Sequence, residues 1–439
     1  MPSGNILLVL MPPFWPKMPH LGLGCLQAFL EQKGLAAEIF DLNNLFYNLS
    51  SQDLKKEWLL SCNVYLEENI LRLIENNFGT QYRQALEKML DYDTVGFSCS
   101  KSNFLATLEV VELLRKRRKD IRIVLGGSEI TRQFFKGKGT IKKEFRQLAD
   151  FLVVGEGETP LFNYLAAKGK FDKVAAFQQL ANLGGLNFPR YQGLNFSDYP
   201  RKDAVALQLS RGCIGRCCFC SERLLYKGFR ARNQQSVIEE IKYHKQNNHT
   251  DYFIFFDSLL NADLTLLEEL CDKIIDNFGS FAWEAQMVIR SDMSEQLLKK
   301  MKKSGCYNLF IGLESGSAVT LKRMHKGFSP DEASRFFTQL NSAGLAFGIS
   351  VIVGYPGESA KNFQESLDFV LRHQKIIPKI EQVNPFTYYD GTGASQKADY
   401  KLNKSALSRW DYFLRQIKQH DFRYTNAFLG NLIEKDGRV

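Results

Sequence analysis

The chain has 439 residues, of which 44% are hydrophobic, and it carries a net charge of +9 at pH 7. This length allows more than one buried core, and no apolar run approaches the roughly 18 residues that a membrane span needs. The basic residues concentrate at the ends of predicted helices, where they stay solvated, so nucleic-acid binding is the minority interpretation. The start of the chain lacks the basic residues of a secretory signal, so we expect a cytoplasmic protein.

The first part of the chain, residues 1–169, alternates short apolar runs with amphipathic stretches. This alternation predicts a parallel sheet with helices on both faces, a doubly wound (Rossmann-like) domain. Residues 51–90 predict additional helices before the third strand. The expected strands are Asn5–Met11, Ala36–Asp41, Thr94–Ser98, Ile121–Leu125 and Phe151–Val154.

Residues 170–204 carry a Gly-Gly pair and two X-Pro steps and read as a linker, with a short helix near Val174–Leu180. From Val205 the pattern of strand then helix repeats six times, which favours a partial (β/α)6 TIM-type barrel over residues 205–390. A C-terminal helical tail is expected over residues 391–439. The expected barrel strands are Val205–Leu209, Tyr252–Phe256, Phe281–Val288, Asn308–Gly312, Phe347–Val353 and Glu381–Asn384.

Cys213, Cys217 and Cys220 form a C-x3-C-x2-C pattern directly after the first barrel strand. Thiolates are the usual protein ligands of iron–sulfur clusters, and three of them on a four-iron cluster leave one iron open. A structural zinc site normally has four ligands, and no histidine lies near this loop. Nine cysteines are an odd number for a disulfide framework. Choosing Cys218 instead of Cys217 gives a poorer spacing, so Cys218 is interpreted as a packing residue.

The triplet, with Phe219 before its last cysteine, resembles the signature of the radical S-adenosylmethionine (radical SAM) superfamily. The resemblance implies that Cys213, Cys217 and Cys220 bind a [4Fe–4S] cluster and are the catalytic residues. It also implies S-adenosylmethionine as cosubstrate and an electron donor such as flavodoxin or ferredoxin. In this family the reduced cluster cleaves S-adenosylmethionine to a 5′-deoxyadenosyl radical.

Further motifs at the strand ends resemble the cosubstrate site of the family. Gly312–Ser315 is similar to its Gly-Leu-Glu-Ser stretch, and Gly348–Glu358 to its G-x-I-x-G-x-x-G-E motif, with Ser350 in place of the first glycine. For Asp257, expected to accept from the methionine ammonium, helix capping is the alternative role. The resemblance implies that S-adenosylmethionine is bound by Phe219, Asp257, Arg290, Glu314, Val351, Val353 and Gly354.

The N-terminal block carries five distinctive segments: Met11–Phe14, Pro19–Leu23, Val95–Ser98, Ile123–Gly127 and Val154–Glu158. With these segments it resembles the cobalamin-binding domain that precedes the barrel in one large radical SAM subfamily. Its small and acidic residues fall at the carboxyl ends of predicted strands, the edge where open α/β sheets bind ligands. The D-x-H-x-x-G motif of many such domains is absent: Met18 replaces its aspartate, and His20 is not expected to be a conventional cobalt ligand. The residues implied for cobalamin are Ser98, Gly126, Gly127, Glu156, Gly157 and Glu158.

Together these resemblances imply a cobalamin-dependent radical SAM enzyme that methylates an unreactive carbon of a small-molecule or biosynthetic-intermediate substrate. One alternative is radical cyclisation, dehydration, epimerisation or carbon–carbon bond formation without methyl transfer, with cobalamin ancillary or absent. A second alternative is a non-catalytic iron–sulfur or cobalamin sensor. The substrate itself has no signature in the sequence.

Overall fold

The computed structural model describes residues 6–62, 70–167, 172–389, 391–396 and 404–425. The chain divides into two compact units. Unit 1 comprises Met1–Ala206 with Leu224–Lys227, and unit 2 comprises Leu207–Arg223 with Gly228–Val439. Among the described residues, no helix combines the length and the apolar character needed to cross a membrane. The predicted boundaries at residues 169, 204 and 390 stay a prediction.

Unit 1 is built on a five-stranded parallel sheet of order β2-β1-β3-β4-β5. The interior strand β1 is buried along its whole length, as expected for a sheet covered on both faces. The predicted doubly wound fold is therefore confirmed. The strands are β1 (Ile6–Leu10), β2 (Ala37–Asp41), β3 (Thr94–Ser98), β4 (Arg122–Gly126) and β5 (Phe151–Leu152).

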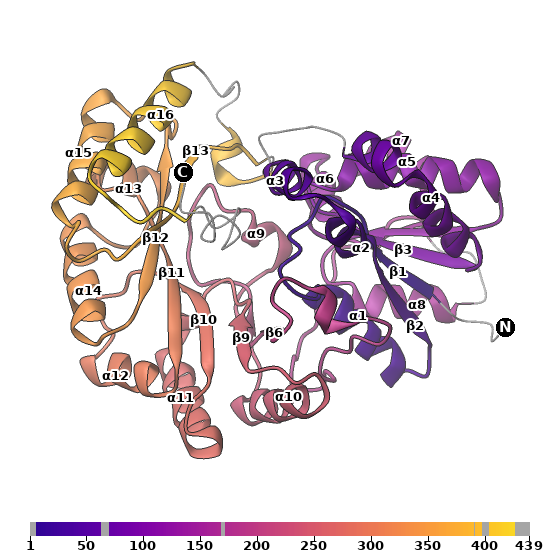
Figure 1. Ribbon diagram of the computed structural model, residues 1–439, viewed down its shortest axis with the longest axis horizontal. Helices are drawn as coiled ribbons and strands as arrows, with labels where there is room; N and C mark the ends of the chain where they lie inside the picture. The colour runs from indigo at the N-terminus through magenta and orange to yellow at the C-terminus, as the bar shows by residue number, and fades with distance from the viewer. Residues whose placement is uncertain (1–5, 63–69, 168–171, 390, 397–403, 426–439) are drawn as a thin grey trace. The chain divides into compact units, whose positions relative to one another are not determined.

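Helices cover both faces of this sheet, with α1 and α8 on one face and α4 and α5 on the other (Figure 1). The predicted extra helices over residues 51–90 are present as α3 and α4. The α3 side chain Trp58 is fully buried, and its Nε1 donates to Asn43 Oδ1 at 2.9 Å. The helices are α1 (Leu21–Gln32), α2 (Leu42–Leu49), α3 (Gln52–Ser61), α4 (Leu71–Leu90), α5 (Phe104–Arg117), α6 (Ser128–Lys136), α7 (Lys143–Leu148) and α8 (Glu158–Ala166).

The predicted helix over Val174–Leu180 is wrong. This segment instead runs alongside β5, with parallel bridges from Leu152 to Val174 and from Gly155 to Gln178. The edge strand β5 offers unpaired backbone groups, and the Leu152 N–H donates to Lys173 O at 2.8 Å. Pairing with a sheet edge therefore replaces the internal hydrogen bonds of a helix. A single 3-10 turn, η1 (Phe196–Asp198), follows later in the linker.

Unit 2 is built on a six-stranded sheet of order β13-β12-β11-β10-β9-β6, in which the strands from β9 to β13 pair in parallel. The strand β6 begins in the last residues of unit 1 and ends at Leu207, the first residue of unit 2. A short antiparallel pair, β7 (Ser210–Arg211) and β8 (Arg230–Ala231), precedes and follows the cysteine loop. The predicted partial barrel is confirmed. Its strands are β6 (Ala204–Leu207), β9 (Tyr252–Phe255), β10 (Ala282–Met287), β11 (Cys306–Glu314), β12 (Phe347–Val353) and β13 (Ile380–Pro385).

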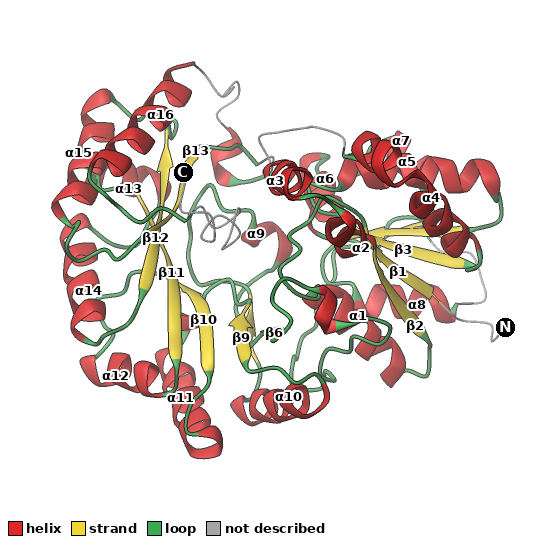
Figure 2. Cartoon of the chain, in the orientation of Figure 1, coloured by secondary structure: helices red, strands yellow, loops and turns green. Residues whose placement is uncertain are grey.

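Helices line the outer side of this sheet, as Figures 1 and 2 show for α11, α12, α14 and α15. The predicted tail contains α16, whose Phe413 is buried and whose Trp410 Nε1 donates to Val383 O at 2.6 Å. The helices are α9 (Glu222–Leu225), α10 (Gln234–Asn247), η2 (Leu260–Ala262), α11 (Leu264–Phe278), α12 (Glu295–Lys303), α13 (Ala318–Met324), α14 (Pro330–Ser342), α15 (Ala360–Arg372), η3 (Gly393–Gln396) and α16 (Lys404–Gln419).

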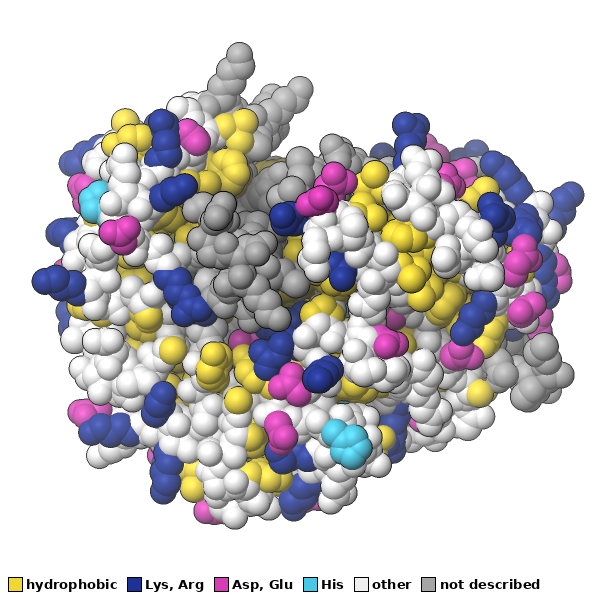
Figure 3. Space-filling view, in the orientation of Figure 1, with side chains coloured by type: hydrophobic (Ala, Val, Ile, Leu, Met, Phe, Trp, Pro, Cys, Tyr) yellow, Lys and Arg dark blue, Asp and Glu magenta, His cyan; other side chains and the backbone are white. Residues whose placement is uncertain are grey.

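Charged side chains of both signs are spread over the face seen in Figure 3, and many Lys and Arg stand beside acidic residues. On α12, for example, Lys299 pairs with Glu295 at 2.5 Å, and Lys300 pairs with Glu268 and Asp272 at 2.8 Å. Part of the positive charge is thus paired locally.

Candidate functional site

The three cysteines of the motif lie on the loop that follows β6 and β7. All three are free and half-buried. Gly215 lies between the first two: a Cβ added there would be 3.2 Å from Cys213 Sγ and 3.9 Å from Cys217 Sγ. Glycine at 215 therefore keeps the space beside these two sulfur atoms open. The thiol of Cys220 interacts with those of Cys213 and Cys217, and three sulfur donors on one short loop suit an iron–sulfur cluster.

Burial raises the pKa of all three thiols, and that of Cys220 to about 12. Lys326 opposes this effect at Cys213 and Cys217, so its ammonium group lies close to the loop. A bound metal displaces such protons, because only the thiolate is a strong ligand. Within the described parts of the chain, no group of three or more His, Cys, Asp or Glu is arranged to hold a single metal ion.

Cys218 packs against a buried hydrophobic cluster of unit 2 that contains Met324, Tyr355, Phe386 and Ala394. Its Sγ lies 2.9 Å from Tyr355 Oη and 3.3 Å from Arg323 O. Its backbone N–H donates to Met324 O at 3.1 Å, and its carbonyl accepts from the Ala394 N–H at 2.9 Å. These contacts account for the side chain and support its interpretation as a packing residue.

Phe219 packs edge-on against Tyr355, with ring centroids 6.4 Å apart, and Tyr355 packs in the same way against Phe386 at 5.0 Å. Tyr355 thus joins the cysteine loop to the glycine-rich turn after β12. Tyr355 is not among the predicted site residues, although it lies inside the Gly354–Glu358 motif.

Asp257 follows β9 and is almost completely buried. It accepts hydrogen bonds from the backbone N–H groups of Leu209 (3.0 Å) and Ser210 (2.5 Å) and from Ser210 Oγ (2.5 Å). Burial raises its pKa to about 6. The carboxylate fixes the entry of the cysteine loop, and its predicted contact with a methionine ammonium stays a prediction.

Arg290 follows β10, and four of its N–H contacts are made within the protein. They reach the Asp292 carboxylate at 2.8 and 2.6 Å, the Asn261 carbonyl at 2.9 Å and the Ala262 carbonyl at 2.8 Å. A guanidinium has five N–H donors, so little capacity is left for a bidentate grip on another carboxylate. Its predicted role towards the cosubstrate also stays a prediction.

Glu314 is the last residue of β11 and has φ 65°, a conformation that is rare for a non-glycine residue. Its carboxylate is contacted on both oxygens, by Lys326 Nζ at 3.4 Å and by Ser350 Oγ at 3.1 Å. Its negative charge opposes deprotonation of Cys217, so it lies near the cysteine loop. A strained backbone at a residue whose carboxylate lies near the cysteine loop makes Glu314 a candidate functional residue.

Val351 and Val353 on β12 are both buried, whereas Ile352 between them is partly exposed. A ligand on the exposed side would therefore meet the valines through their backbone. Gly354 has φ 76°, which favours glycine, and its N–H donates to Glu358 Oε2 at 2.9 Å. Glu358 thus stabilises the turn that the motif forms.

The cobalamin residues predicted after β3 and β4 come together at one edge of the unit 1 sheet. Ser98 and Gly126 are the last residues of neighbouring strands and pair in register. Gly127 has φ 99°, and a Cβ there would lie 2.6 Å from Cys99 O. Packing against the backbone of Cys99 is therefore sufficient to require glycine at 127.

The predicted residues after β5 are also held by their own unit. Glu156 is buried and accepts from the Leu180 N–H at 2.5 Å, and a Cβ on Gly157 would lie 3.1 Å from Leu26 Cδ2. Glu158 is buried at the start of α8. The predicted cobalamin contacts of these residues stay a prediction.

His20 caps the N-terminus of α1, where its Nδ1 accepts from the Leu23 N–H at 3.2 Å. Burial lowers its pKa to about 4, so the ring is neutral at pH 7. This capping role agrees with the prediction that His20 is not a conventional cobalt ligand.

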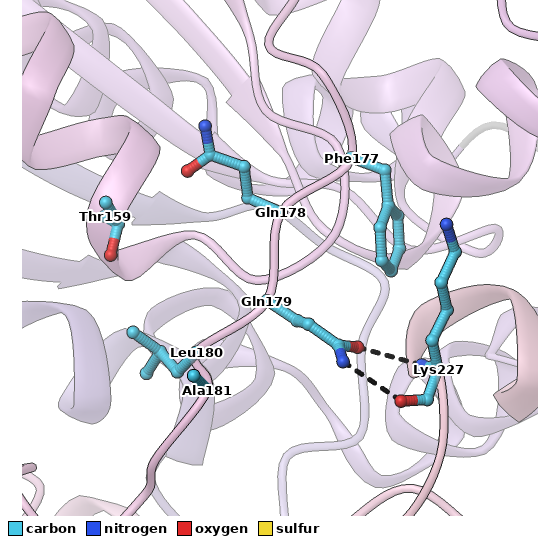
Figure 4. A pocket seen from close by; sticks show the side chains of 7 residues that line it. All are labelled: Thr159, Phe177, Gln178, Gln179, Leu180, Ala181 and Lys227. Carbon is cyan, nitrogen blue, oxygen red and sulfur yellow. Dashed lines mark hydrogen bonds between the residues drawn. The ribbon is translucent and has the colours of Figure 1, made fainter.

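A hollow of about 530 Å³ lies beside the segment that pairs with β5, and Figure 4 shows its lining. Gln179 Nε2 donates a hydrogen bond to Lys227 O at 3.0 Å, and the Lys227 N–H donates to Gln179 Oε1 at 2.9 Å. Lys227 Nζ lies 4.5 Å from the centre of the Phe177 ring. A second hollow on unit 2 lies beside α13, α14 and α15. None of the predicted site residues lines either hollow.

Comparisons with known proteins identify similar sequences and folds. The model of the radical SAM superfamily matches residues 207–370. An uncharacterised methyltransferase of Pyrococcus horikoshii is 24% identical over 70% of this chain and 69% of its own. The anaerobic magnesium-protoporphyrin IX monomethyl ester cyclase of Synechocystis is 25% identical over 72% of this chain and 66% of its own.

Two solved structures share the fold of the chain. The cobalamin-dependent S-adenosylmethionine radical enzyme OxsB, with aqua-cobalamin and S-adenosylmethionine bound, gives a TM-score of 0.65 at 17% identity. The match covers 95% of this chain but 56% of OxsB. The radical S-adenosylmethionine methyltransferase TsrM of Kitasatospora setae, with cobalamin and a [4Fe–4S] cluster bound, gives 0.69 at 15% identity, covering 90% of this chain and 77% of TsrM.

Proposed function

We propose that this chain, which belongs to the radical SAM superfamily, is an enzyme that transfers a methyl group to carbon with the help of cobalamin. The observation that carries the proposal is the cysteine loop, in which the thiols of Cys213, Cys217 and Cys220 lie close enough to raise one another's pKa, with the carboxylate of Glu314 near Cys217. Cys213, Cys217 and Cys220 would hold the [4Fe–4S] cluster. The first unit, which has the fold seen in cobalamin-bound relatives, would hold the corrinoid.

The cofactors supply the difficult chemistry when bound: a 5′-deoxyadenosyl radical from S-adenosylmethionine, and a methyl carrier in cobalamin. The protein orients them. Asp257 holds the backbone at Leu209 and Ser210, and this defines the position from which the cysteine loop starts. Glu314 presents a carboxylate whose remaining lone pairs can accept from the ammonium or ribose hydroxyls of the cosubstrate.

In unit 1 the proposed corrinoid site is the carboxyl edge of the sheet, where Ser98 and Gly126 present little side-chain bulk. His20 is engaged as a helix cap, and the D-x-H-x-x-G motif is absent. We therefore propose that cobalamin would bind without a cobalt ligand from a histidine of this motif.

A direct test needs no knowledge of the substrate. The chain is reconstituted anaerobically with iron and sulfide, reduced cobalamin is added, and S-adenosylmethionine with a deuterated methyl group is supplied. Mass spectrometry should detect deuterated methylcobalamin and S-adenosylhomocysteine, together with 5′-deoxyadenosine when the cluster is reduced. Failure of the wild-type chain to bind iron and to form any of these products would overturn the proposal.

A second candidate is radical ring formation without methyl transfer. It is favoured by the relative named as a cyclase, which matches as much of this chain as the relative named as a methyltransferase. In that case 5′-deoxyadenosine would form, but the deuterated methyl group would not reach cobalamin. The same experiment therefore separates the two candidates.

A further inference from the structure

We infer that Lys326 and Ser350 form a clamp that fixes the carboxylate of Glu314 in the proposed cosubstrate site, and that both are positioning residues. The inference rests on the proposed function and adds to it two residues that the sequence motifs do not assign. Ser350 occupies the position where the sequence departs from the family motif, and Lys326 lies outside every motif.

The clamp starts from the turn that ends α13. His325 adopts the left-handed conformation (φ 57°), and the Lys326 N–H returns to Leu321 O at 3.0 Å. This is a common way for a helix to terminate, and it reverses the chain. The Lys326 side chain is then 6% exposed, whereas that of Lys322, within α13, is exposed.

A buried ammonium group is costly unless it meets a negative charge. The ion pair found for Lys326 is the one with Glu314, at 3.4 Å, and the group also lies near the thiols of Cys213 and Cys217. The pair lies against Gly312: a Cβ there would be 2.4 Å from Glu314 Oε1 and 3.2 Å from Lys326 Nζ. Glycine at 312 is therefore what leaves room for the pair.

Ser350 completes the clamp from the neighbouring strand β12. Its Oγ donates to Glu314 Oε2 at 3.1 Å, so the two carboxylate oxygens are held by different partners. Glycine, the residue of the family motif at this position, has no side chain with which to make this bond. The departure at Ser350 thus has a physical role in this chain.

Holding both oxygens restricts rotation of the carboxylate, and the backbone strain at Glu314 needs such surrounding contacts to persist. The clamp leaves each oxygen a second lone pair, which can face a ligand. The expected consequence is tighter binding of S-adenosylmethionine, without a direct contribution to assembly of the cluster.

The test measures S-adenosylmethionine binding to the full, reconstituted chain by equilibrium dialysis, together with iron per chain and thermal unfolding. Lys326→Met should weaken binding about tenfold, the effect of losing a hydrogen bond to a charged group, and Ser350→Gly about fivefold. Lys326→Arg should retain most of the affinity. The control Lys322→Met, on the exposed side of α13, should bind as the wild type does.

A double-mutant cycle decides whether the residues act through Glu314. Once Glu314→Gln has been introduced, adding Lys326→Met or Ser350→Gly should change the affinity by less than about twofold, because there is no carboxylate left to hold. Wild-type affinity in both single variants, or full additivity with Glu314→Gln, would overturn the clamp. If the wild-type chain itself bound neither iron nor S-adenosylmethionine, the proposed function would fail instead.

Discussion

The two parallel sheets of this protein use the same edge in different ways. At the carboxyl edge of the unit 1 sheet, the candidate residues Gly127, Glu156 and Gly157 all have contacts within their own unit that account for them. At the corresponding edge of the unit 2 sheet, Glu314 has a positive φ and is held by the buried Lys326, which lies near the thiols of Cys213 and Cys217. A motif residue therefore identifies a ligand site most clearly where packing alone does not explain the presence of that residue.

The largest expected effect concerns the cysteines. Replacing any one of Cys213, Cys217 or Cys220 by Ala should reduce bound iron to background, because a cluster ligand is lost. Cys218→Ala should leave iron nearly unchanged, because its thiol contacts Tyr355 and the Arg323 carbonyl instead. Iron and sulfide per chain after anaerobic reconstitution measure the effect. Loss of iron in Cys218→Ala would show that the register of the motif is wrong.

The next effect tests whether Gly127 is structural. Gly127→Ala should destabilise the fold by about 3 kcal/mol, because the residue has a positive φ and the new Cβ would meet the Cys99 backbone. Gly34→Ala is the matched control: φ is also positive, but nothing lies within 4 Å, so about 1 kcal/mol is expected. Denaturant unfolding of both variants compares them. Equal losses would contradict the packing explanation of Gly127.

The buried carboxyl group of Asp41 in unit 1 should make the stability of the protein depend on pH. It is buried at the end of β2, where it accepts from Tyr199 Oη and from the Asn44 N–H, both at 2.8 Å. Burial raises its pKa from 3.8 to about 6. Between these two pKa values the folded state binds more protons at Asp41 than the unfolded state does. The contribution of Asp41 to the free energy of unfolding therefore falls as the pH rises from about 4 to about 6.

Asp41→Asn should remove this dependence while leaving an oxygen to accept a hydrogen bond. The melting temperature of the wild type should therefore fall relative to that of the variant between about pH 4 and pH 6, and the difference should stay constant above that range. Parallel curves over the whole range would show that Asp41 does not titrate in this way.

The smallest effect is expected at His20. Asn is a favoured helix cap, so His20→Asn should change stability by less than about 0.5 kcal/mol and leave the absorption spectrum of bound cobalamin unchanged. His20→Ala loses the cap and should cost about 1 kcal/mol. A shift of the cobalamin spectrum in the Asn variant would mean that the histidine binds cobalt after all.

The sequence was sufficient for the fold because strand periodicity is a local property. Thr94–Ser98 was predicted with its correct bounds, and Phe347–Val353 likewise. The barrel strand predicted over Asn308–Gly312 was too short, because β11 continues through a bulge to Glu314. The helix predicted over Val174–Leu180 was wrong because pairing with β5 depends on a tertiary contact.

The candidate site was less accessible from the sequence. The motif predicted Glu314, but Lys326 follows an amphipathic helix and nothing in the pattern distinguishes it from the exposed Lys322. The partners of Asp257 and Arg290 are largely backbone groups, which have no sequence signature. Hydrogen-bond saturation of a motif residue is therefore visible only in three dimensions.

The linker segment beside β5 has a consequence for solubility. An uncovered edge strand can recruit the edge of a second molecule and start aggregation. Here the Leu152 N–H and carbonyl are taken by Lys173 O and the Ala175 N–H, at 2.8 and 2.9 Å. Deleting residues 172–178 would expose that edge, and the shortened chain is expected to self-associate.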